Sequence, residues 1–337
     1  MTGKILVTGG AGYIGSVVVE QLLARGRPIV VLDDLSTGHR AAVDPGAEFV
    51  EGSIGDRRVL EGLFARHAID GLMHLAAFAL VAESVAHPQK YFANNVTAGR
   101  VLLEAAVAAG VRRVIFSSSC TVYGQRGDAP IDEAAPVKPA NPYGETKVEF
   151  ERLLAGYAES HGLASASLRY FNAAGASERY GEDHAPETHL IPNVLRVALG
   201  QGDAVEVYGT DYPTPDGTAV RDYVHVLDLA DAHIRALDAD LGGAVVLNLG
   251  TGTGYSVRAV TEAARRVTGR AIPTVGRARR AGDPPWLVAA TGRAEGLLGW
   301  RPRHSSLEEI LASACRWHQA HPSGYRQLTS SPGEGEG

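Results

Sequence analysis

Short apolar runs alternate with amphipathic segments along the first half of the chain. Residues 4–7 form one such run, and apolar residues at helical spacing follow at 16–25. The run is typical of a buried parallel strand, and the spacing is typical of a helix that packs on one face. The pattern repeats, with further strands predicted at 28–32, 47–50, 72–77 and 112–119 and further helices after Asp56 and at 88–109. This order predicts an α/β fold, a doubly wound parallel sheet of the Rossmann type with helices on both faces.

The second half is less regular and predicts a second, smaller domain built from separate segments. We expect this domain at the carboxyl edge of the sheet, where ligands of such sheets bind. The predicted first domain comprises residues 1–172 with 218–243, the second comprises 173–217 with 244–325, and 326–337 form a flexible tail. Predicted strands lie at 164–172, 205–208, 220–226 and 245–249, and predicted helices at 143–162, 190–199, 227–237 and 257–267.

Composition narrows the class of protein. The net charge of the 337 residues is −6, with both signs spread along the chain. We therefore expect neither a nucleic acid nor a membrane surface as a partner. Cys120 and Cys315 are far apart in sequence, and the chain has no signal-like N-terminus and no membrane-length apolar run. These features predict a cytoplasmic protein in a reducing compartment.

Twelve histidines raise the question of a metal site. We find no two of them at ligand spacing with a supporting carboxylate or cysteine, and His318 and His321 are expected to share one face of a terminal helix. We therefore predict no bound metal.

A glycine-rich turn joins the first predicted strand to the first predicted helix. It reads Gly10-x-Gly12-x-x-Gly15, with Gly9 in addition. Glycines allow a tight turn, a close approach of the backbone to a pyrophosphate, and close packing of the helix on the strand. The helix N-terminus adds free N–H groups and the positive end of its dipole. The turn predicts a dinucleotide site, the alternative being a purely structural turn.

An acidic pair, Asp33 and Asp34, ends the second predicted strand. A carboxylate at this distance from the glycine turn can accept hydrogen bonds from the adenosine ribose and repels a 2′-phosphate. Asp33 thus favours NAD over NADP. The alternative is an aspartate that caps a loop.

Tyr143 is followed by a lysine four residues later, at the start of a predicted helix. The spacing places Tyr143 and Lys147 on one face, where the ammonium favours the phenolate and so favours a general base. Ser119 ends the fifth predicted strand at the carboxyl edge, where its hydroxyl can hold a substrate oxygen near the tyrosine. A surface pair is the alternative for the tyrosine and lysine taken alone.

These motifs resemble the extended short-chain dehydrogenase/reductase superfamily and, within it, the UDP-glucose 4-epimerases. The resemblance extends from Lys4 to about Tyr325 and is carried by the segments 8–15 (TGGAGYIG), 117–124 (SSSCTVYG), 142–147 (PYGETK), 168–172 (LRYFN) and 209–225. The last segment, with Asp216-Gly-Thr and Val220-Arg-Asp-Tyr-Val-His225, is the most specific. The resemblance implies an enzyme that interconverts UDP-glucose and UDP-galactose through a 4-keto sugar with tightly bound NAD, and a homodimer formed by the helices 88–109 and 143–162.

The resemblance also implies roles for individual residues. Tyr143 matches the catalytic base, Lys147 the residue that holds the nicotinamide ribose, and Ser119 the hydroxyl on the sugar O4. The positions implied for the cofactor are Gly9, Gly12, Tyr13, Ile14, Gly15, Asp33, Asp34, Ser53, Ile54, Leu75, Ala76, Ala77, Asn94, Ser117, Tyr143, Lys147 and Tyr170. Those implied for the nucleotide sugar are Ser119, Tyr143, Phe171, Asn172, His189, Leu190, Tyr208, Arg221, Arg280, Asp283 and Leu287.

The chain departs from the family at four positions. Ser53 stands where an aspartate is usual and Ala79 where a lysine is usual, so we expect weaker cofactor binding. His189 replaces a usual asparagine, and Cys120 a usual alanine. None of these is the predicted base, lysine or serine, so we expect activity to survive.

Three other functions remain open at this stage. An epimerase of UDP-N-acetylhexosamines or UDP-pentoses would share every motif. A 4,6-dehydratase would need an acid and a base after Ser119, where this chain has Cys120 and Thr121. A non-catalytic NAD-binding regulator is disfavoured because Tyr143 and Lys147 are both present.

Overall fold

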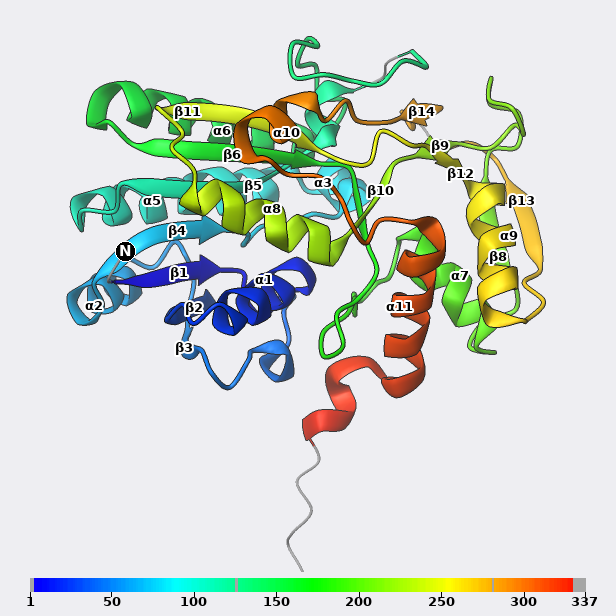
Figure 1. Cartoon of the computed structure of the whole chain (residues 1–337), viewed down its shortest axis with the longest axis horizontal. Coiled ribbons are helices and arrows are strands. Elements are labelled where there is room, and N and C mark those ends of the chain that lie inside the picture. The colour runs from blue at the N-terminus through cyan, green and yellow to red at the C-terminus, as the bar shows by residue number, and fades with distance from the viewer. Residues whose placement is uncertain (1–2, 125–126, 281, 330–337) are drawn as a thin grey trace, which may run out of the picture.

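The computed structural model describes residues 3–124, 127–280 and 282–329. A seven-stranded parallel sheet dominates it, in the order β11-β6-β5-β4-β1-β2-β3 (Figure 1). This order reverses beside β1, as in doubly wound dinucleotide-binding folds. The strands are β1 (Lys4–Thr8), β2 (Ile29–Asp33), β3 (Glu48–Glu51), β4 (Ile69–His74), β5 (Arg113–Ser119), β6 (Ala164–Tyr170) and β11 (Ala244–Leu249). The predicted fold class is confirmed.

Alternate residues of the central strands face two separate apolar cores. Ile5 and Val7 of β1 contribute to one core, with α1 (Tyr13–Ala24), α8 (Val226–Asp238) and α10 (Gly292–Leu298). Leu6 between them contributes to the other, with α2 (Arg57–Arg66), α5 (Gly99–Ala108) and α6 (Pro142–His161). Figure 1 shows α1 and α8 side by side along the sheet. The continuous apolar runs of the strands follow from burial on both faces.

A third apolar core lies beyond the carboxyl edge of the sheet, at the right of Figure 1. It is built from α7 (Leu190–Ala198), α9 (Val257–Thr268) and α11 (Leu307–Ala320). The short strands outside the large sheet pair with one another in small sheets. They are β7 (Asn172–Ala174), β8 (Val205–Tyr208), β9 (Val220–Arg221), β10 (Tyr223–His225), β12 (Tyr255–Ser256), β13 (Thr274–Arg277) and β14 (Trp286–Leu287).

Two predicted elements differ from the structure. The predicted helix 88–109 is instead α4 (Pro88–Tyr91), a π-helical stretch Phe92–Ala98 and α5. The predicted strand 220–226 is divided into β9 and β10, because the Asp222 carboxylate turns inward to accept hydrogen bonds from Thr251, Gly252 and Ala289.

The predicted domain boundary at residue 244 also needs correction. Residues 244–249 were assigned to the second domain, but they form β11, which pairs with β6 over its whole length. The predicted tail at 326–337 falls mainly outside the described residues, and Gly324–Thr329 form a 3-10 turn. The short helix α3 (Val81–Ala86) lies between β4 and α4 in the chain. Within the described ranges, no helix combines the length and the apolar character needed to cross a membrane.

Candidate active site

The glycine-rich turn between β1 and α1 is too tight for side chains. Gly9 has a φ of +76°, and a Cβ there would come within 2.5 Å of the Ala76 nitrogen. A Cβ on Gly15 would overlap the carbonyl oxygen of Gly9. Gly12 is different, because a Cβ there would meet only that same oxygen, at 3.4 Å. The turn therefore needs glycine at positions 9 and 15, because side chains there would clash with backbone atoms. The space beside Gly12 is open to a ligand.

The first turn of α1 fits a diphosphate. Gly12 precedes the helix, and no side chain caps the N-terminal N–H groups. Tyr13 and Ile14 begin the helix, so their backbone N–H groups lie at the positive end of the dipole. The residues present thus fit the pyrophosphate of NAD.

Asp33 is buried at the end of β2, beside this turn. One carboxylate oxygen accepts from the Ala11 N–H at 3.0 Å and the other from the Leu35 N–H at 2.9 Å. Burial raises the pKa of Asp33, while the two backbone hydrogen bonds oppose the rise. The carboxylate is therefore held in position by the glycine turn itself, which leaves its remaining lone pairs for a ribose.

Most of the other predicted cofactor residues follow the carboxyl ends of β2, β3 and β4. Asp34 is exposed and accepts from the Ser36 N–H. Ser53 accepts from the Gly55 N–H in the loop after β3, next to buried Ile54. Leu75, Ala76 and Ala77 follow β4, and Asn94 lies in the π-helical stretch.

Tyr143 and Lys147 occupy the first turns of α6, where Asn141 caps the helix with a hydrogen bond from the Gly144 N–H. Tyr143 is 9% exposed and Lys147 is 3% exposed. The Lys147 ammonium donates to the Ser117 carbonyl at 2.8 Å and lies 5.5 Å from the centroid of the Tyr143 ring. The four-residue spacing therefore does place both side chains together, and β5 holds the lysine in place.

Burial governs the pKa values of this pair. It lowers the pKa of Lys147 to about 7 and raises the pKa of Tyr143 well above its usual value, against a hydrogen bond from Ser119 that lowers it. The spacing of Tyr143 and Lys147 alone predicts that the lysine lowers the pKa of the tyrosine. In the structure the loss of hydration is the larger effect, and a further positive charge nearby would favour ionisation of Tyr143.

Ser117 and Ser119, at the end of β5, place hydroxyl groups near Tyr143 and Lys147. Ser117 hydrogen-bonds to the phenol of Tyr170, whose pKa burial raises to about 12. Ser119 accepts from both the N–H and the hydroxyl of Thr121, at 3.2 and 3.0 Å. The structure thus brings Ser117, Ser119, Tyr143, Lys147 and Tyr170 into one connected group.

The predicted sugar-side residues form two groups. Phe171 and Leu287 belong to a small apolar cluster with Cys120, immediately after Ser119 in the chain. Arg221 pairs with Asp283 at 2.6 Å, and it faces Leu287 across the β9–β14 pair. These positions therefore adjoin the predicted catalytic residues.

The second sugar-side group lies on β8 and after β13. Here the Arg280 guanidinium stacks over the Tyr208 ring at 4.0 Å. Asn172, on β7, has a buried side-chain oxygen without a hydrogen-bond partner among the described residues. Such an oxygen is available to a ligand.

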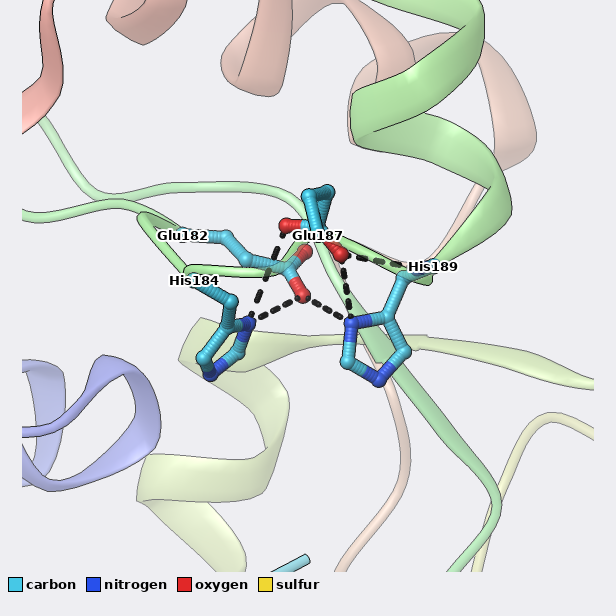
Figure 2. A group of neighbouring side chains, drawn as sticks. All are labelled: Glu182, His184, Glu187 and His189. Atoms are coloured by element: carbon cyan, nitrogen blue, oxygen red, sulfur yellow. Dashed lines mark hydrogen bonds and ion pairs between the residues drawn. The ribbon is translucent and has the colours of Figure 1, made fainter. Parts of the chain in front are cut away.

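His189, a predicted sugar-side residue, lies in a group of ion pairs. Its Nδ1 contacts the carboxylates of Glu182 and Glu187 at 2.7 and 2.9 Å, directly before Leu190 begins α7. His184 contacts the same two carboxylates (Figure 2). His184 and His189 therefore do lie at ligand spacing with supporting carboxylates, which the sequence-based interpretation excluded.

Two residues that the sequence patterns do not single out, Asn95 and Glu151, position the site. Asn95, in the π-helical stretch, bonds both backbone groups of Phe78 and the hydroxyl of Thr146, one residue before Lys147. Glu151 on α6 accepts from Ser118 and forms a buried ion pair with Arg169. Asn95 thus ties α6 to the segment after β4, and Glu151 ties α6 to β5 and β6. A π-helical stretch of this kind is frequent at functional sites.

Comparison with known proteins now gives the family. Residues 5–250 match the NAD dependent epimerase/dehydratase family. The chain is 50% identical to the UDP-glucose 4-epimerase of Streptomyces lividans over 96% of this chain and 99% of that protein. The chain belongs to the NAD dependent epimerase/dehydratase family.

Solved structures agree with this assignment. The epimerase of Brucella ovis in complex with NAD is 46% identical, with a TM-score of 0.90 over 94% of this chain and 98% of that one. The Bifidobacterium longum epimerase with NAD+ and UDP is 38% identical, with a TM-score of 0.91 over 95% and 99%. The predicted cofactor, NAD, and the predicted class of enzyme, a nucleotide-sugar 4-epimerase, are confirmed.

Proposed function

We propose that this epimerase interconverts UDP-glucose and UDP-galactose, with Tyr143 as the base and Lys147 and Ser119 beside it. The observation that carries the proposal is the buried group of Tyr143, Lys147 and Ser119 at the carboxyl edge of the sheet, behind a glycine turn that fits NAD. Relatives over nearly the full chain are UDP-glucose 4-epimerases.

The residues of the chain suit a reversible oxidation at C4 of the sugar. The Tyr143 phenolate accepts the proton of the 4-hydroxyl and later returns it, while Ser119 holds the O4 oxygen. NAD, when bound, supplies the acceptor for the C4 hydride and a positive charge. Lys147 positions the ribose and favours the phenolate together with that charge. The low exposure of this group excludes water and keeps the 4-keto sugar in the site.

The residues around Arg221 and Arg280 suit the nucleotide part of the substrate. A guanidinium such as Arg221 or Arg280 binds a diphosphate in a bidentate manner, and Asp283 can accept from ribose hydroxyls. An aromatic ring such as Tyr208 can stack on uracil. A firm grip on the nucleotide leaves the hexose free to turn, which epimerisation at C4 requires.

The experiment that tests the proposal uses UDP-galactose with the purified protein and no added reductant. We expect UDP-glucose to accumulate until the two sugars reach equilibrium, as measured by chromatography. A 4,6-dehydratase would instead yield a 4-keto-6-deoxy product, and a regulator would yield none. Either result would contradict the proposal, although Cys120 and Thr121 already disfavour a dehydratase.

Leu287 is proposed to limit the size of the sugar 2-substituent. It is buried in the cluster with Phe171 and Cys120. Leucine leaves more room than tyrosine, so we expect weak turnover of UDP-N-acetylgalactosamine beside efficient turnover of UDP-galactose. Steric room matters more than a missing hydrogen bond, since overpacking costs about 1–3 kcal/mol and a lost neutral hydrogen bond about 0.5–1.5 kcal/mol. Leu287→Tyr should suppress turnover of UDP-N-acetylgalactosamine and spare turnover of UDP-galactose.

The matched control is Leu287→Met, which preserves side-chain volume and should keep both activities. Initial rates on the two sugars give the comparison. Equal loss of both activities in Leu287→Tyr, or no change in either, would show that the neighbouring Trp286 or another residue limits the pocket.

We also propose a cytoplasmic homodimer. The buried free thiols of Cys120 and Cys315 are consistent with a reducing compartment. The proposed interface is formed by residues 88–109, which comprise α4, the π-helical stretch and α5, and by α6, and exposed Val81 and Val85 of α3 extend it with apolar surface. Light scattering that gave the mass of a single chain would contradict the dimer.

A further inference from the structure

Four side chains converge in the loop before α7. Glu182, His184, Glu187 and His189 each offer one ligand atom, and these atoms all lie within 4.8 Å of one another. Figure 2 shows both imidazoles turned so that Nδ1 faces the two carboxylates. We call this group the Glu182–His189 cluster. Within the described part of the chain, it is the one group of histidine, cysteine and acidic residues with such a geometry.

The distances in the cluster fit a tetrahedral metal site. For metal–ligand bonds of about 2.0–2.1 Å, the ligand atoms of tetrahedral zinc lie about 3.3–3.4 Å apart. From His184 Nδ1 the two carboxylate oxygens lie at 3.1 and 3.7 Å. From His189 Nδ1 the same Glu182 oxygen lies at 2.7 Å, and the other oxygen of the Glu187 carboxylate lies at 2.9 Å. These nitrogen–oxygen distances lie on both sides of the tetrahedral value, so small shifts would accommodate an ion.

A network of hydrogen bonds alone leaves the same contacts poorly satisfied. Each Nδ1 carries at most one proton, yet each has two carboxylates beside it, so one N–H must serve two acceptors. The side chains of Glu182 and Glu187 are only 6% exposed, so two carboxylates lie close together away from solvent and need two positive charges beside them, from protonated imidazoles or from a cation. A divalent cation with two neutral imidazoles would neutralise both carboxylates.

We propose that the Glu182–His189 cluster binds one divalent transition-metal ion, Zn²⁺ foremost. Two imidazole nitrogens with two carboxylate oxygens are a donor set for zinc and its neighbours in the first transition row. Calcium and magnesium prefer ligand sets made of oxygen alone. His184 and His189 remain partly exposed, at 33% and 49%, which gives an ion a path to the cluster.

The position of the cluster assigns the ion a structural role. The Tyr13 ring, at the start of α1, packs edge-on against His184, and Tyr13 also donates to the Gly175 carbonyl. Asp183 accepts from His39 in the loop after β2. The loop that carries the cluster continues directly into α7 after His189. A metal here would fasten the loop of the second part onto the glycine turn that fits NAD.

The test begins with tag-free protein and measures bound metal by plasma mass spectrometry after dialysis. We expect near-stoichiometric zinc in the wild type, and the intense visible bands of tetrahedral cobalt after exchange with Co²⁺. Replacement of groups that only hydrogen-bond to metal ligands already weakens metal binding roughly 10- to 100-fold. Loss of a direct ligand in His184→Ala or Glu182→Gln should therefore weaken metal binding by more than about 100-fold. Chelation should also speed the release of NAD from the wild type.

The matched control is His304→Ala. His304 pairs through Nδ1 with one exposed carboxylate, Glu309, at 2.7 Å, so its loss should not change the metal content. Cobalt exchange on the wild type needs no variant, and it keeps the test valid if a variant fails to fold. No metal in the wild type under saturating zinc, an octahedral cobalt spectrum, or equal metal content in His184→Ala would each overturn the proposal. The cluster would then be an ionic network.

Discussion

Tyr143→Phe should reduce epimerisation by on the order of 100- to 10,000-fold, which is the usual contribution of general acid–base catalysis. The substitution removes the phenol oxygen and keeps the ring, so the packing of the first turn of α6 is preserved. Tyr143 is buried, and no second phenol carries a lysine one turn further along its helix. The measurement is the initial rate of UDP-glucose formation from UDP-galactose, together with the NAD content of the purified variant, which should equal that of the wild type.

The matched control is Tyr157→Phe on the same helix. Tyr157 stacks on His161 near the far end of α6, away from the catalytic turn. This variant should epimerise at the wild-type rate. Near-normal turnover in Tyr143→Phe, with normal turnover in the control, would show that another group takes the proton.

Gly15→Ala should abolish tight NAD binding. The added Cβ overlaps the Gly9 carbonyl oxygen and lies 2.9 Å from the Gly10 Cα, so the turn must open. Both contacts are with backbone, which cannot move aside as a flexible side chain can. Overpacking of this kind costs about 1–3 kcal/mol in stability, and the displaced turn would no longer present its N–H groups to the pyrophosphate. The NAD released on denaturation and the thermal midpoint measure the two effects.

Gly156→Ala provides the control for Gly15→Ala. Gly156 is also a helical glycine, in α6, and a Cβ there meets nothing within 4 Å. Alanine should stabilise this position by about 0.4–1 kcal/mol through the unfolded chain. We expect full NAD content and an unchanged or higher midpoint. Full NAD content in Gly15→Ala as well would contradict the role assigned to the glycine turn.

Local patterns made much of the fold and part of the site predictable. A Cβ on Gly15 would overlap the carbonyl oxygen of Gly9, which lies in the same turn. The spacing of these glycines in the sequence therefore reflects a local steric constraint. Tyr143 and Lys147 are one helical turn apart, so their shared face follows from the period of the helix. Ser119 could be placed because strand ends of a parallel sheet meet at one edge.

The remaining features depend on contacts that no local pattern contains. Asn95 acts through Phe78 and Thr146, which the chain brings near it only when α6 packs. The pKa of Tyr143 depends on burial, which a charge-based argument from Lys147 alone leaves out. The Glu182–His189 cluster was missed for a different reason. Its ligands alternate between acid and histidine within eight residues of an irregular loop, a spacing outside the familiar zinc motifs.

The place of β11 in the sheet has a consequence for how the chain folds during its synthesis. The strand pairs with β6, yet it is made only after the whole segment between residues 171 and 243 has left the ribosome. Until then β6 remains an open edge, with unpaired backbone groups that invite association with other chains. Domains generally fold as units during synthesis, and long-range parallel pairing is slow. A fragment that stopped at residue 172 would keep that exposed edge permanently.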